Sequence, residues 1–212
     1  MANQTITKIT IGEAQMNFVR VFEPEAFNGG EPKYSVILSF PQENGELVKK
    51  IQDAIDACVE KAKNTMYGGK LPKNFKIVEL KDGDTDYEKD GFAGMFTLKA
   101  SSAYKPEVVK KKTMMGKPQL VPITDEEEFY SGCFGYASVS FFAYDNGVSK
   151  GVTCGLNGLL KSRDGERLGG SGSAAADFAD VLGSLPDADV LGSLPDADVC
   201  GSLPDADDEE FI

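Results

Sequence analysis

The last 42 residues of the chain, 171–212, contain eleven acidic residues and no lysine or arginine. They repeat the unit Gly-Ser-Leu-Pro-Asp-Ala-Asp-Val-Leu, which begins at Gly183, at Gly192 and, cut short, at Gly201. Each unit offers little beyond valine and leucine to bury, and its proline interrupts any helix. Three such units cannot build a solenoid core. The pattern therefore predicts a disordered acidic tail and confines the fold to the preceding residues.

The charge divides along the same boundary. All 22 lysine and arginine residues lie in 1–170, together with 23 of the 34 acidic residues, so this part has a net charge near −1 of the total −12. A chain of this length suits one domain with a sizeable core. We therefore predict a folded domain over residues 1–170, neutral overall but with local basic clusters, and a separate tail over 171–212.

The sequence contains no histidine. This excludes Ser-His-Asp and Cys-His nucleophiles and removes the commonest metal ligand. The absence of histidine therefore favours a non-enzymatic binding role, and no cofactor or metal is predicted. No apolar run approaches the roughly 20 residues that span a membrane, and the N-terminus lacks the layout of a signal peptide. A cytoplasmic protein is expected.

Four cysteines, Cys58, Cys133, Cys154 and Cys200, are present without any C-x-x-C pair. The first lies in a helical pattern and the next two in strand-like stretches. Buried thiols are therefore predicted in preference to a disulfide or metal role, which fits a reducing compartment.

Hydrophobic periodicity predicts a mainly β (α+β) domain with one principal helix. Apolar residues recur at helical spacing over residues 46–66, and Gly68 and Gly69 end the pattern. Five or six strands around one helix favour a small curved β-barrel, with a five-stranded OB-fold as the obvious candidate, although strand count alone allows other α+β sheets. Phe18, Phe96 and Phe141 are expected in its core. The predicted strands are 6–22, 33–40, 95–101, 134–144 and 148–160.

The acidic segment 82–90 has the alternating carboxylates of a calcium-binding loop. It lacks the glycine at the sixth position and the glutamate at the twelfth, counting from Asp82. We interpret it as a solvated loop. The alternative is a carboxylate-metal nuclease that uses Asp82, Asp84 and Asp86.

Basic and aromatic residues occur together in a way that suits nucleic acid. A protein that binds single strands without reading sequence needs cations for phosphates and aromatic faces for bases. A solvated charged face is the plainer interpretation, but the lysine triplet at 110–112 stands out in a domain of near-zero net charge. Tyr104, Tyr136 and Phe142 are the strongest stacking candidates. The full predicted DNA-binding set is Arg20, Lys33, Tyr34, Lys99, Tyr104, Lys105, Lys110, Lys111, Lys112, Lys117, Tyr136, Phe142, Lys161, Arg163 and Arg167.

The end of the tail places acidic residues before an apolar pair. Such a tip can dock into a basic pocket of a partner, with Phe211 as the anchor. On its flexible tether it can also compete with nucleic acid for the basic groove of its own domain. A simple solubility tail is the alternative. The predicted partner-binding residues are Asp207, Asp208, Glu209, Glu210, Phe211 and Ile212.

Four strings carry a resemblance to a known family. They are FEPEAFNGGEPKYSV (22–36), YSGCFGYAS (130–138), GVTCGLN (151–157) and KSRDGERLGG (161–170). Together they resemble a family of phage-encoded single-stranded-DNA-binding proteins that was long catalogued only as a domain of unknown function. The resemblance covers about residues 6–170. It implies an OB-fold that coats single-stranded DNA during phage replication and recombination, with an acidic C-terminal tail.

The sequence therefore predicts a largely sequence-independent single-stranded-DNA-binding protein whose tail recruits replication and recombination proteins. Affinity for duplex DNA and a homo-oligomer are left open. The alternatives are a strand-annealing or duplex-tolerant architectural protein, the nuclease above, and a virion structural protein. A DNA-binding assay, an annealing assay, a degradation assay with Mg²⁺ or Mn²⁺ and the protein content of virus particles distinguish them.

Overall fold

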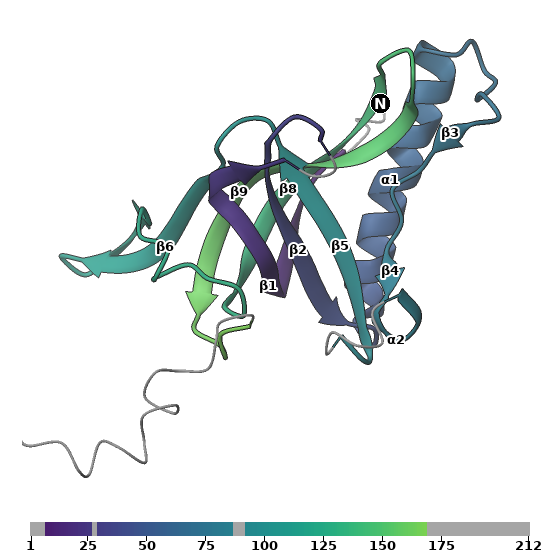
Figure 1. The fold of residues 1–212 in the computed structure, drawn as a ribbon. Helices are drawn as coiled ribbons and strands as arrows, with labels where there is room; N and C mark the ends of the chain where they lie inside the picture. The colour runs from purple at the N-terminus through teal and green to yellow at the C-terminus, as the bar shows by residue number, and fades with distance from the viewer. Residues whose placement is uncertain (1–6, 27–28, 87–91, 169–212) are drawn as a thin grey trace, which may run out of the picture. The chain divides into compact units, whose positions relative to one another are not determined.

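The computed structural model describes residues 7–26, 29–86 and 92–168. The acidic tail, Cys200 and the tail tip lie outside these residues, so the expectations for them remain predictions, as does the domain boundary at 170. In chain order the elements are β1 (Lys8–Glu25), β2 (Lys33–Pro41), α1 (Gly45–Thr65), β3 (Phe75–Lys76), β4 (Lys81–Asp82), α2 (Gly83–Asp86), β5 (Met95–Ser102), β6 (Glu107–Met114), β7 (Lys117–Pro122), β8 (Phe134–Asp145) and β9 (Lys150–Arg163) (Figure 1).

Five strands close a barrel. β1 pairs antiparallel with β2 on one side and with β8 on the other. β2 pairs antiparallel with β5, and β8 with β9. The barrel closes where β5 meets β9 in parallel, at Ser101 and Gly155. The order β1-β2-β5-β9-β8 is that of an OB-fold, so the predicted fold class is confirmed.

The barrel core follows from alternation along the strands, which sends every second side chain inward. Ile11 and Met16 of β1, Leu38 of β2 and Phe141 of β8 are at most 1% exposed. The expectation for Phe141 is thus confirmed, and Phe96 packs partly buried against the same core. Phe18 is different: its side chain is 49% exposed, and the prediction that it belongs to the core was wrong.

The principal helix agrees closely with its predicted range. Asn44 caps α1, its Oδ1 accepting a hydrogen bond from the Leu47 backbone nitrogen at 3.2 Å. Leu47, Ile51 and Ile55 recur on the buried face of the helix, which contacts β1, β8 and β9. The helix lies beside the barrel (Figure 1). No helix among the described residues is long and apolar enough to cross a membrane.

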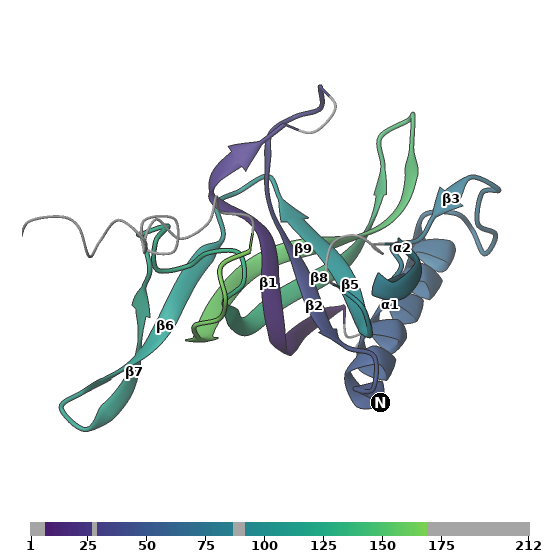
Figure 2. The ribbon, with the colours of Figure 1, turned by 60° about the horizontal axis from the view of Figure 1, so that its bottom comes forward.

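A hairpin that the periodicity did not predict extends from the barrel. β6 pairs in parallel with β9, and β7 pairs antiparallel with β6. We call residues 107–122 the arm. Both views show it projecting on the side of the barrel away from α1 (Figures 1 and 2).

The three described cysteines are buried free thiols, as predicted. Burial raises the pKa of the Cys154 thiol from 9.0 to about 12. Because this pKa is higher in the folded than in the unfolded chain, its contribution to stability is complete below about pH 9. It falls as pH rises toward 12.

We therefore expect the unfolding free energy of the protein to fall more steeply above pH 9 than that of Cys154→Ala. The excess slope should be up to about 1.4 kcal/mol per pH unit. Urea unfolding at pH 7, 9, 10 and 11 measures it. Parallel pH profiles would show that Cys154 does not titrate in this way.

Candidate nucleic-acid interface

The outer side of β1, β2 and β5 carries two exposed cations, Arg20 and Lys99, among half-buried side chains. Strand register places Arg20 opposite Ser35 and Ser35 opposite Ser101. In the next row Ile37 lies opposite Lys99. Directly opposite residues share a face of a sheet, so these five side chains point the same way. We call them the front face; it joins three segments that are distant in sequence and brings together the predicted residues Arg20 and Lys99.

Small hydrogen-bonded side chains hold the sheet beside the front face. Asn17, Ser39 and Thr97 point to the same side of the sheet but are only 1–2% exposed. The Asn17 Nδ2 atom donates to Ser39 Oγ at 2.6 Å, and Ser39 lies opposite Thr97. A buried side-chain hydrogen bond between β1 and β2 fixes their relative position, which gives the front face a rigid base.

Phe18 adds an aromatic ring to this side of the barrel. The ladder between β1 and β2 is irregular between Asn17 and Arg20, and Phe18 has a positive φ of 48° at that irregularity. Its ring lies 6.4 Å from that of Phe92. A β-bulge commonly re-aims a side chain in this way. Phe18 is thus an exposed stacking candidate that the sequence reasoning missed.

A second group of predicted residues meets at the end of β5. Tyr34 lies opposite Ser102, and the Tyr104 backbone nitrogen donates to Ser102 Oγ at 3.1 Å. The Tyr104 side chain is 85% exposed. Lys105 places its Nζ 5.8 Å from the centre of the Phe22 ring. Lys33 is exposed at the start of β2. The segments around residues 20, 34 and 104 therefore form one region.

The arm carries the lysine triplet. Lys110 forms an ion pair with Glu128 across the base of the arm. Lys111, Lys112 and Lys117 are exposed along the arm, and no ion-pair partner for them occurs among the residues the structure describes. Their alternation in β6 sends Lys111 and Lys112 to opposite faces of the arm.

The predicted cluster after β9 is engaged within the protein. Lys161 pairs with Asp164 at 2.7 Å, Arg163 with Glu13 at 3.2 Å and Arg167 with Glu127 at 2.8 Å. Arg163 also stacks 3.5 Å above the Phe134 ring, and Arg167 4.3 Å above Tyr130. Lys161 lowers the pKa of Asp164 by hydrogen bonding, with the Tyr130 hydroxyl adding to the effect. These contacts tie residues 164–168 to the barrel, and the DNA-binding role predicted for this cluster remains a prediction.

Tyr136 and Phe142 lie on the outer side of β8, apart from the front face. Each ring rests on a glycine: a Cβ at Gly12 would lie 1.9 Å from Tyr136, and one at Gly155 would lie 2.7 Å from Phe142. The rings are 40% and 48% exposed. Only glycine permits such close approach of ring and backbone. Both rings thus keep an accessible side, as predicted, but on another part of the barrel.

Two carboxylates of the acidic loop accept hydrogen bonds from neighbouring residues. Gln42 donates to Asp82 Oδ1 at 2.8 Å, and Asp84 Oδ1 accepts from the Gly94 backbone nitrogen at 2.8 Å. The side chain of Asp86 lies outside the described residues. Within the described ranges no three carboxylate or cysteine side chains gather as a metal site would require.

A closed OB-fold barrel with cations and exposed aromatic rings on the outer side of its first three strands defines the class of OB-fold proteins that bind single-stranded nucleic acid. The chain belongs to the family described as "Enterobacter phage Enc34, ssDNA-binding protein", whose model matches residues 7–190. The resemblance inferred from the four sequence strings is confirmed.

Individual relatives agree with this assignment. The chain is 32% identical over 186 residues to putative protein p50 of Acyrthosiphon pisum secondary endosymbiont phage 1, covering 82% of this chain and 94% of the relative. The solved structure of the single-stranded DNA-binding protein from bacteriophage Enc34 in complex with ssDNA is 26% identical, with a TM-score of 0.60, covering 77% of this chain and 90% of that one. Another structure of the Enc34 protein gives a TM-score of 0.59 at 26% identity, over 82% and 90% of the two chains.

Proposed function

We propose that this protein binds single-stranded DNA, largely without regard to sequence, and coats it during phage replication and recombination in the host cytoplasm. It acts as a binding protein and not as an enzyme. The observation that carries the proposal is the front face with its cations on β1 and β5, together with the exposed rings of Phe18 on β1 and Tyr104 just after β5. The family assignment supports the same ligand.

In the proposed contact the cations meet phosphates and the rings hold bases. Lys99 and Arg20 lie on the front face, where Arg20 also pairs with Glu25, and Lys105 lies at its end. Phe18 and Tyr104 offer faces on which bases stack without base-specific hydrogen bonds. Tyr136 and Phe142 lie on β8, so a strand that crosses the front face does not need them.

The tail has two roles in this proposal. Its acidic residues compete with phosphates for the front face, and its tip, residues 207–212, recruits replication and recombination proteins. The chain gives the tip an acidic approach and an apolar anchor, Phe211 and Ile212. A partner with a basic, partly apolar pocket fits this chemistry.

Titration of a fluorescent oligonucleotide at several salt concentrations tests the function. Each phosphate neutralised contributes about −0.7 to the slope of log K against log salt. Lys99→Gln and Lys105→Gln should each weaken binding and make the slope shallower by about 0.7. Lys70→Gln and Lys73→Gln, in the segment after α1, serve as matched controls and should leave the slope unchanged. Absence of binding at low salt, with and without the tail, would refute the proposal.

A strand-annealing or duplex-tolerant protein is the nearest alternative. Its distinguishing results are accelerated pairing of complementary strands and similar affinities for duplex and single strand. Degradation of DNA with Mg²⁺ or Mn²⁺ would instead indicate a nuclease.

A further inference from the structure

The tip of the arm has a composition that its own fold does not require. Met115 and Gly116 form the turn between β6 and β7 with φ of 51° and 74°. Turns with two positive φ values favour Asn, Asp and Gly. The left-handed region is disfavoured for a methionine, because its Cβ comes too close to the following carbonyl oxygen. Met115 is nevertheless there and fully exposed, at 103%, beside Met114 at 44%. Local conformation and burial both disfavour it, which points to a contact outside this chain.

The charge around the tip indicates which kind of surface it can contact. Residues 108–124 contain no acidic side chain. Met114 lies opposite Lys117, and Lys112 is two residues before Met114, so these three side chains share one face of the arm. The tip therefore fits a surface that combines an apolar hollow with negative charge.

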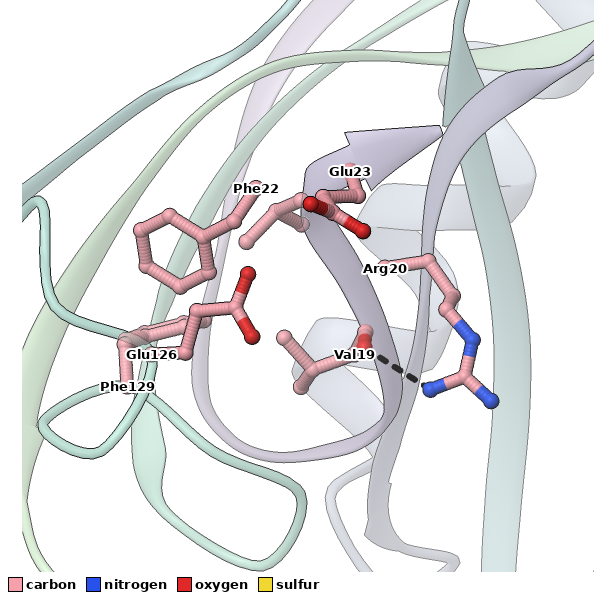
Figure 3. A pocket seen from close by; sticks show the side chains of 7 residues that line it. Val19, Arg20, Phe22, Glu23, Glu126 and Phe129 are labelled. Atoms are coloured by element: carbon pink, nitrogen blue, oxygen red, sulfur yellow. Dashed lines mark hydrogen bonds between the residues drawn. The ribbon is translucent and has the colours of Figure 1, made fainter. Parts of the chain in front are cut away.

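The protein itself carries such a hollow. A cavity of about 310 Å³ lies at the C-terminal part of β1, with Val19, Phe22 and Phe129 among its walls. The carboxylates of Glu23 and Glu126 stand beside it (Figure 3). Neither carboxylate has an ion-pair partner among the residues the structure describes.

The nearby cations do not neutralise these two carboxylates. Arg20 lines the cavity, but its guanidinium is turned to the Val19 carbonyl and to Glu25 (Figure 3). Lys105 lies over the Phe22 ring. The cavity thus joins apolar walls to two carboxylates without an ion-pair partner among the described residues, which suits a lysine-flanked apolar side chain.

An arm cannot fill the cavity of its own molecule. Six residues separate Val109, at the base of the arm, from Met115, which corresponds to about 20 Å of strand. Both views show the tip pointing away from the barrel (Figures 1 and 2). The complementary surface must therefore belong to another molecule.

We propose that the arm tip of one copy docks into the Glu23–Glu126 cavity of the next copy. The contact joins two different surfaces, so it repeats in one direction and forms an open chain of subunits. Resting on the proposed function, this contact links neighbouring copies along single-stranded DNA and makes their binding cooperative.

Paired cysteines test the contact directly. In a Cys200→Ser background, Met115→Cys combined with Glu126→Cys should give a ladder of disulfide-linked oligomers on long poly-dT under mild oxidation. An oligonucleotide that holds one protein should give no ladder. Met115→Cys combined with Lys73→Cys is the matched control, and a ladder of equal yield from that pair would overturn the proposal.

Charge reversal gives an independent test. The ratio of affinities for long poly-dT and for a single-site oligonucleotide measures cooperativity. Lys112→Glu with Lys117→Glu should lower this ratio at least about tenfold, as should Glu23→Lys with Glu126→Lys, and the four changes together should restore it. Binding to the short oligonucleotide with no ladder and an unchanged ratio would refute the docking alone. Absence of binding to the short oligonucleotide would refute the proposed function itself.

Discussion

Removing residues 171–212 is expected to tighten the binding of single-stranded DNA by about tenfold or more at low salt. The tail carries eleven negative charges and no positive one. The disordered tether that the sequence predicts would keep these charges at an effective concentration in the millimolar range near the front face. We expect them to compete there with phosphates for Lys99, Lys105 and Arg20. Titration of a short labelled oligonucleotide with the full chain and with a chain ending at Gly170 measures the difference.

Varying the salt concentration distinguishes this competition from other effects of truncation. The Debye length shrinks from about 30 Å at 0.01 M to about 8 Å at 0.15 M, so the advantage of the short chain should largely disappear at higher salt. A full-length tail with its aspartates and glutamates changed to asparagine and glutamine is the matched control. It should bind like the truncated chain. Equal affinities of all three proteins at low salt would show that the tail does not compete.

The barrel could be predicted because its strands carry a local signal. In β2 the inward side chains Val36, Leu38 and Phe40 alternate with Lys33, Ser35 and Ile37, and in α1 the buried residues recur at helical spacing. These periods are properties of a single segment and can be read without the rest of the chain. The helix, expected at 46–66, occupies Gly45–Thr65.

The arm and Phe18 could not be predicted in the same way. β6 is rich in lysine and β7 contains Pro118 and Pro122, because both strands are largely exposed and need no alternating apolar face. Phe18 follows the inward Met16 by two residues, so alternation places it in the core. The irregularity between Asn17 and Arg20 breaks that alternation, and its position depends on pairing with β2.

The basic cluster after β9 shows a further limit of local sequence. Lys161, Arg163 and Arg167 look like a free cationic patch when only neighbouring residues are considered. Arg163 finds its partner in Glu13, 150 residues earlier. Charge composition predicts which residues are cationic, but only the fold decides which cations are already paired.

Replacing both Phe18 and Tyr104 by alanine is expected to weaken single-stranded-DNA binding by about 2–6 kcal/mol, which is at least about thirtyfold in Kd. Each ring contributes about 1–3 kcal/mol if a base stacks on it. The Tyr104 side chain is 85% exposed, so its loss should leave the fold intact. Phe18 contacts Phe92, so thermal unfolding of each variant accompanies the binding titrations.

Conservative substitutions of the two rings, and the loss of a ring on another strand, show whether the weaker binding comes from stacking on the front face. Tyr104→Phe keeps the ring and should bind like the natural protein, whereas Phe18→Leu keeps the apolar contact with Phe92 but should still bind weakly. Phe142→Ala removes a ring of similar exposure, 48%, from β8 and should change Kd less than about twofold. If Phe142→Ala weakened binding as much as Tyr104→Ala does, the DNA would have to bind on the outer side of β8 and β9. Single-mutant losses that add up in the double variant would indicate that the two rings hold different bases.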